Sequence, residues 1–256
     1  MSEQNQVLVN PQLDGTPFFW EAGPVGVLLL HGLTATTTEV RLLGEDLFTN
    51  DYTVMAPLLP GHGTTPEELN EQSWEDWAWE AEKSLQHLLT ICDYVFVAGE
   101  SMGGALALYL AIRFPEIAGV ICYAPAIQLN MTAVQLVQLR AFAPFKESLP
   151  KEKNGHNPYW QGYDVHPLKA VETLVSLGNY VRHHLEKIEQ PLMVIQGRND
   201  ETVAADVGET ILDGVSSTSK ELIWMENSAH VILLEDEREQ IFSLTRKFLA
   251  EIMVVK

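Results

Sequence analysis

The feature that most constrains the fold is an alternation of short, almost continuously apolar runs with longer segments of helical period. The runs rich in Val, Ile and Leu, which we expect to be strands, are 25–30, 52–58, 94–98, 118–123, 192–196 and 221–225. The segments with helical spacing between them are 39–49, 74–90, 101–114, 204–212 and 233–254. Strands that are apolar at nearly every position fit a parallel sheet covered on both faces. The alternation therefore predicts an α/β fold with a doubly wound, mostly parallel sheet.

One long stretch interrupts this alternation. Between residues 126 and 190 no strand is expected, and two helical segments, 128–145 and 168–188, flank a charged loop that contains Pro and Gly. We therefore expect residues 1–125 and 191–256 to form one α/β domain. Residues 126–190 are expected to form a helical cap over one end of its sheet, inserted between the expected strands 118–123 and 192–196.

The first helical segment of this insertion is unusually apolar. Only Thr132, Gln135 and Gln138 form a polar strip along residues 128–145. A helix with so wide an apolar face either packs onto the domain or helps to bind an apolar ligand, and the sequence favours neither.

Charge and composition exclude several classes of partner. The chain has 35 Asp and Glu against 16 Lys and Arg, a net charge of −19, which repels phosphate backbones and anionic lipid headgroups. We expect no nucleic-acid partner and no stable membrane insertion, because no apolar stretch approaches the length of a membrane span. The first residues lack the order of a secretory signal, and Cys92 and Cys122 lie singly inside apolar runs, which together predict a cytoplasmic protein. The sequence leaves monomer and homodimer open.

The strongest local motif is G-x-S-x-G over residues 99–103. It follows the expected strand 94–98 directly and precedes an expected helix, which is the context of a nucleophile elbow. Gly99 and Gly103 are needed there because side chains at these positions would collide with the neighbouring backbone. The motif predicts Ser101 as a nucleophile.

A serine nucleophile needs a base, and the base needs an acid that orients it. In this type of fold the chain order is serine, acid, histidine, with each residue at the end of a later strand. Asp200 follows the expected strand 192–196, and His230 follows the expected strand 221–225. Of the other histidines, His31 and His62 also flank strand ends, but both precede the serine. The order therefore selects Asp200 and His230.

Acyl transfer also requires donors for the anionic oxygen of the tetrahedral intermediate. One backbone N–H is expected from Met102, the residue after the nucleophile, and the other from the loop that follows strand 25–30. In that loop Gly32 allows the turn that directs the Leu33 amide to the site. The side chains and backbone that we expect to contact substrate belong to His31, Gly32, His62, Met131 and Leu136.

Several segments resemble one known family. LLLHGLTATTTEVRLLGEDL, YTVMAPLLPGHGTTPEEL, VAGESMGG, VIQGRNDETV and SAHVILLEDEREQI are similar to the carboxylesterase and monoacylglycerol-lipase group of the α/β-hydrolase superfamily. The similarity spans essentially the whole catalytic domain, whereas the cap matches only in helical content and in position, which the resemblance places after the sixth strand of the family fold. The resemblance implies an α/β-hydrolase fold, a triad of Ser101, Asp200 and His230, and oxyanion donors at Leu33 and Met102.

The resemblance and the apolar cap together imply an enzyme, a carboxylesterase. We expect it to cleave short- to medium-chain esters by a two-step acyl-enzyme mechanism, with a small ester or lipid-like substrate. Monoacylglycerol lipase, thioesterase and carbon–carbon bond hydrolase remain alternatives because one triad serves them all, and a non-catalytic ligand-binding protein of this fold is a further one. No cofactor or metal is expected, since the sequence lacks HExxH and clustered carboxylates.

Overall fold

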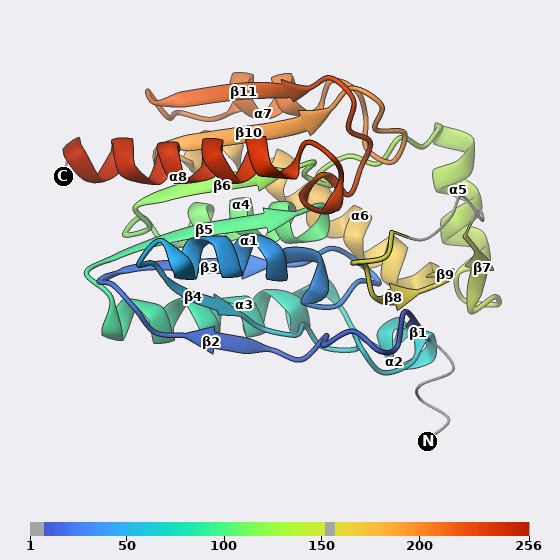
Figure 1. The fold of residues 1–256 in the computed structure, drawn as a ribbon. Helices are drawn as coiled ribbons and strands as arrows, with labels where there is room; N and C mark the ends of the chain where they lie inside the picture. Colours follow the sequence, from blue (N-terminus) through green and yellow to red (C-terminus); the bar gives the residue numbers. More distant parts are fainter. Residues whose placement is uncertain (1–7, 152–156, 256) are drawn as a thin grey trace.

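The central element of the computed structural model, which describes residues 8–151 and 157–255, is a seven-stranded sheet of order β11-β10-β6-β5-β3-β4-β2 (Figure 1). Its strands are β2 Phe18–Trp20, β3 Val25–Leu30, β4 Thr53–Ala56, β5 Tyr94–Glu100, β6 Gly119–Tyr123, β10 Leu192–Gly197 and β11 Lys220–Met225. All neighbours pair in parallel except β2, which pairs antiparallel with β4 at the edge. The predicted doubly wound, mostly parallel sheet is confirmed.

The helices cover both faces of this sheet, as the alternation of buried side chains requires. In β3, Leu28 and Leu30 pack with one hydrophobic cluster while Val27 and Leu29 pack with another on the opposite face. The helices on the first face are α3 Trp74–Ile91, α4 Met102–Arg113 and α7 Val207–Gly214, and α6 Leu168–Arg182 packs against α3 and α4. Those on the second face are α1 Thr38–Thr49 and α8 Arg238–Val255. Two-sided burial explains why the strands read as continuous apolar runs.

One short α-helix and two 3-10 helices lie in the connections between the longer elements. The five-residue helix α2, Pro66–Asn70, begins after Thr65, whose side chain accepts a hydrogen bond from the Glu68 amide. The 3-10 helices are η2 Leu185–Lys187 and η3 Ile232–Leu234. Across the described residues, no helix is both long and apolar enough to cross a membrane.

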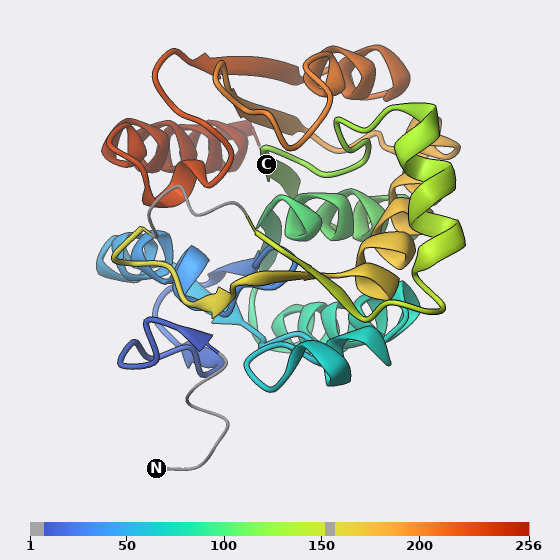
Figure 2. The same cartoon turned by 90° about the vertical axis from the view of Figure 1, so that its right-hand side faces the viewer.

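The insertion between β6 and β10 lies across the carboxyl ends of the parallel strands (Figures 1 and 2). Besides α6 it contains α5 Ala133–Phe142 and three short strands, β7 Ser148–Pro150, β8 Gly162–Tyr163 and β9 Val165–Pro167. The expectation of no strand here is therefore wrong. β7 pairs with β9, and β8 pairs with β1 Leu8–Val9 near the start of the chain. Strands of two or three residues carry no periodic pattern, so the sequence does not reveal them.

Helix α5 is shorter than the predicted segment 128–145 and largely exposed. Thr132 and Gln135 do not lie along a polar strip but form a capping box that starts the helix. Of its side chains only that of Leu139 is buried, whereas Val134 and Val137 are two-thirds exposed. Part of the predicted charged loop, residues 152–156, lies outside the described residues. The division of the chain into a main domain and a cap stays a prediction.

Candidate active site

The predicted elbow is a sharp turn between β5, which ends at Glu100, and α4, which begins at Met102. Ser101 sits in this turn with φ 56° and ψ −114°, a backbone conformation that side-chain-bearing residues rarely adopt. A Cβ on Gly99 would lie 2.2 Å from the Gly103 carbonyl oxygen, and a Cβ on Gly103 only 1.9 Å from the Leu30 carbonyl oxygen. The turn therefore requires both glycines of the motif.

The structure brings Ser101, Asp200 and His230 together in one hydrogen-bonded chain. Ser101 Oγ lies 2.8 Å from His230 Nε2, and His230 Nδ1 lies 2.8 Å from Asp200 Oδ2. A carboxylate only accepts, so Nδ1 carries the proton and Nε2 is left to accept from the serine hydroxyl. The Asp200 carboxylate is fully buried, and its other oxygen accepts the backbone N–H groups of Thr202 (2.8 Å) and Val203 (3.2 Å).

The predicted oxyanion donors lie in the two segments that flank this serine. Met102 is the first residue of α4, and Leu33 follows Gly32 in the loop between β3 and α1. Within the described part of the chain, the amides of Leu33 and Met102 donate to no protein acceptor, whereas the Gly32 amide donates to Glu39 Oε2. A Cβ on Gly32 would lie 3.2 Å from Ser101 Cβ, so this loop is in contact with the nucleophile. Free amides at this position can stabilise an oxyanion.

His31 and His62, two of the predicted substrate contacts, face the protein interior. The Nδ1 of His31 donates to the Gly32 carbonyl (2.9 Å), and its Nε2 accepts the Leu59 amide (3.1 Å). His62 Nδ1 lies 3.1 Å from the Leu59 carbonyl oxygen, and its ring packs edge-on against that of His31. Burial lowers the pKa of His31 to about 4 and that of His62 well below its ordinary value, so both rings are neutral. Their contacts indicate that they hold the loop at Leu59 against β3.

Met131 and Leu136, the other predicted substrate contacts, line a cavity of about 240 Å³ between α5 and α6. Its remaining lining residues are Ala126, Ile127, Gln128, Leu129, Arg140, Val175, Asn179 and Arg182. The cavity adjoins the elbow, because the Ala126 amide donates to the Ser101 carbonyl (2.9 Å), but no triad residue lines it. Met131 and Leu136 therefore share this cavity with no triad residue, and their contact with substrate stays a prediction.

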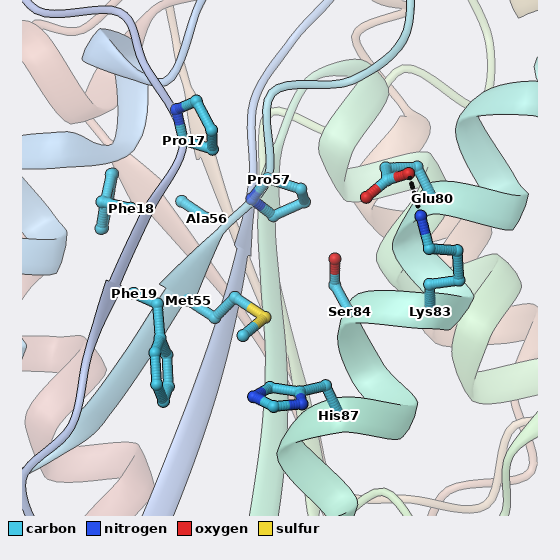
Figure 3. A pocket seen from close by; sticks show the side chains of 10 residues that line it. All are labelled: Pro17, Phe18, Phe19, Met55, Ala56, Pro57, Glu80, Lys83, Ser84 and His87. Atoms are coloured by element: carbon cyan, nitrogen blue, oxygen red, sulfur yellow. Dashed lines mark hydrogen bonds and ion pairs between the residues drawn. The ribbon is translucent and has the colours of Figure 1, made fainter.

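A shallower hollow of about 450 Å³ lies at the far edge of the sheet, where β2 and β4 face α3 (Figure 3). Phe19, Met55 and His87 lie around it, and the ion pair of Lys83 with Glu80 (2.8 Å) closes one side. None of the residues predicted for catalysis lines this hollow. Across the described residues, no group of three His, Cys, Asp or Glu side chains could hold a metal ion.

Sequence reasoning missed two buried acids beside the nucleophile. Glu39 is in the first turn of α1, and Glu100 is the last residue of β5; both are almost completely buried. Glu39 resembles a surface acid that favours a helix N-terminus, and Glu100 occupies the unrestricted position before the serine of the motif. Only their burial distinguishes them.

A parallel α/β sheet with a Ser-His-Asp arrangement at the carboxyl ends of its strands defines a serine hydrolase of the α/β-hydrolase fold. The family model described as serine aminopeptidase, S33, matches residues 25–161 and 156–237. The chain belongs to this family, and the predicted fold class and resemblance are confirmed.

Relatives and solved structures agree with this assignment over nearly the whole chain. The thermostable monoacylglycerol lipase of Bacillus sp. (strain H-257) is 32% identical over 98% of this chain and 99% of its own. The carboxylesterase of Bacillus subtilis (strain 168) is 31% identical over 92% of this chain and 96% of its own. A solved structure from work on the metagenome-derived lipolytic enzymes LipS and LipT is 34% identical, covers 93% of this chain and 99% of its own, and has a TM-score of 0.85.

Proposed function

We propose that this protein is a carboxylesterase that cleaves short- to medium-chain esters through an acyl-enzyme, with Ser101, His230 and Asp200 as its catalytic residues. The observation that carries the proposal is the chain of two 2.8 Å hydrogen bonds from Ser101 through His230 to Asp200. The names of the relatives, a carboxylesterase and a monoacylglycerol lipase, support ester hydrolysis.

In the proposed mechanism His230 Nε2 takes the proton of Ser101 while Ser101 Oγ attacks the ester carbonyl. Asp200 fixes the imidazole tautomer and stabilises the imidazolium that forms. The amides of Leu33 and Met102 hold the oxyanion, and His230 then protonates the leaving alcohol. Water, deprotonated by His230, attacks the acyl-enzyme in the same way and releases the acid.

A monoacylglycerol lipase is the second candidate, and the 32% identity over nearly the full length of such an enzyme favours it. Both candidates take a small ester or lipid-like substrate, work without a cofactor and fit a cytoplasmic location, which we propose as well. Initial rates on p-nitrophenyl butyrate, monoacylglycerols and acyl thioesters would separate the candidates. Monoacylglycerols preferred over the aryl ester would favour the lipase.

The catalytic assignment is tested with a fluorophosphonate label followed by peptide mapping. We expect the label on the peptide that contains Ser101, and we expect Ser101→Ala to abolish both labelling and esterase activity. Ser176→Ala is the control, because this exposed serine of α6 donates only to the Glu172 carbonyl oxygen. Labelling that persists in Ser101→Ala would refute the assignment.

A further inference from the structure

Two buried carboxyl groups with no part in the proposed mechanism lie directly beside Ser101. Glu39 is 4% exposed, and Glu100, the residue before the nucleophile, is fully buried. Burying one ionised carboxylate requires hydrogen bonds or a cation, and burying two adjacent ones also brings mutual repulsion. The surroundings of the two groups therefore decide which of them is charged.

The carboxylate of Glu39 is well provided with donors and cations. Its Oε2 accepts the Gly32 amide of the oxyanion loop, and its Oε1 accepts Trp160 Nε1 of the cap (3.3 Å). The ammonium of Lys151, and His230 whenever it is protonated, supply positive charge that favours ionised Glu39. The Lys151 ammonium donates to Thr34 Oγ1 (2.5 Å) in the same loop. Glu39 thus joins the oxyanion loop to the cap.

Glu100 has the opposite surroundings. Its Oε1 accepts the Leu233 amide (3.1 Å), and the Ile232 amide weakly favours its ionised form as well, but its buried Oε2 makes no hydrogen bond of ordinary geometry among the described residues. The charged groups that act on it are the acids Glu39 and Glu235, of which Glu235 accepts the Ala229 amide (2.7 Å). Burial, and next the charge of Glu39, hold the pKa of Glu100 well above its ordinary value. Burial also raises the pKa of Glu39, against its donors and cations.

We propose that Glu39 and Glu100 together retain one proton, carried by Glu100, and that ionised Glu39 is a positioning residue for the oxyanion loop and for protonated His230. The proposal rests on the proposed function, because it assigns roles within that reaction. By accepting the Gly32 amide, Glu39 fixes the peptide group between His31 and Gly32. The next amide along the chain, that of Leu33, is left free to donate to the oxyanion. Its negative charge favours the imidazolium that forms when His230 takes the serine proton. Asp200 and Glu235 are the other acids that face His230.

Three substitutions separate charge from shape. Glu39→Gln removes the charge, so His230 stays neutral to lower pH, and the acid limb of kcat/KM moves down by about half a pH unit or more. Its kcat falls roughly tenfold with little change in KM, because a loosened oxyanion donor weakens transition-state binding. Glu39→Asp keeps the charge but withdraws it by one methylene, so kcat falls while the acid limb stays in place. Glu100→Gln replaces a neutral acid by a neutral amide and leaves the acid limb in place.

The measurement is a pH profile of p-nitrophenyl butyrate hydrolysis for each chain, with Glu45→Gln on the exposed face of α1 as the matched control. An acid limb displaced by Glu100→Gln, or left in place by Glu39→Gln, would overturn the proposal. If one Glu39 variant does not fold, the Glu100→Gln profile alone still decides where the proton is.

A titration of the His230 ring by NMR, assigned with His230→Gln, gives the same displacement without turnover. The titration separates this proposal from the proposed function. A wild-type chain that hydrolyses no ester refutes the function. The NMR comparison of Glu39→Gln with Glu100→Gln still tests the shared proton.

Discussion

At Ser101 a strained backbone is held by its neighbours on three sides. Its amide donates to the Tyr123 carbonyl (2.8 Å), and its carbonyl accepts the amides of Ala105 (3.1 Å) and Ala126 (2.9 Å). A non-glycine residue with φ 56° costs on the order of 1–3 kcal/mol, which these contacts and the packing of β5 and α4 offset. The strain directs the hydroxyl out of the sheet toward His230.

One prediction at the scale of single residues concerns Asp200, the acid of the triad. Asp200→Asn removes the charge opposite His230 Nδ1 and allows the amide to donate to that nitrogen, which holds the wrong tautomer. We expect kcat on p-nitrophenyl butyrate to fall by roughly 10⁴-fold, the size seen when a triad acid is neutralised. Asp206→Asn, at the exposed start of α7, is the control and should keep full activity. A loss of less than tenfold in Asp200→Asn would count against Asp200.

Some residues of the candidate site can be predicted from the order of strands in the sequence, whereas others are recognised only from their burial in the folded structure. Ser101, Asp200 and His230 are found because the order of strands places them at one edge of the sheet. Glu39 and Glu100 are missed because a charged residue in a sequence is ordinarily a surface residue, and only the packed structure shows these two as buried. His31 and His62 are harder to judge for a related reason, since position at a strand end does not tell which way a ring points, and their contact with substrate stays a prediction.

At the scale of elements, the junction of β5 with α4 is set by backbone contact and tolerates no side chain. We predict that Gly103→Ala destabilises the protein by several kcal/mol or prevents folding, because its Cβ would lie 1.9 Å from the Leu30 carbonyl oxygen of β3. Gly26→Ala, in the same strand β3, is the matched control, because its nearest contact is the Cys92 side chain at 2.9 Å, which can move. Urea unfolding of the two variants measures the difference, and equal loss in both would contradict this explanation.

The sequence predicts closely the helices and strands that have a long hydrophobic pattern. It does not predict the short strands that form only by pairing with a distant part of the chain. The strand expected over 25–30 matches β3, because a run of six residues without a polar side chain fits only a strand that is buried on both faces of the sheet. β8 exists only because residues 162 and 163 pair with β1 some 150 residues earlier, a contact without local signal. The same holds for the bridge between Ala35 and Gly162 and the Tyr163 amide that donates to the Thr34 carbonyl (2.9 Å). The insertion between β6 and β10 is therefore fastened through its backbone to the loop that follows β3.

For the whole molecule, the proton on Glu100 makes stability depend on pH. The folded chain keeps this proton above pH 4.5, where the unfolded chain releases it, so Glu100 lowers stability progressively as pH rises from 4.5 toward the raised folded pKa. Glu100→Gln removes this dependence. We expect the variant to gain stability over wild type by about 1.4 kcal/mol for each such pH unit, with no gain at pH 4.

Urea unfolding at pH 4, 6 and 8 measures this difference. His31 and His62 titrate alike in both chains, so their contributions cancel. A stability difference that is constant across this range would show that Glu100 is ionised in the folded state.

The carboxyl pair draws its partners from distant parts of the chain: Gly32 and Trp160 serve Glu39, and Leu233 serves Glu100. A ribosome makes these segments in order, so a nascent chain already contains the serine and both acids long before the last partner of the acids emerges. His230 and Leu233 are only three positions apart, so they emerge almost together. The proposed base and the last partner of the buried acids therefore become available at nearly the same moment, after every other member of the proposed site has been made.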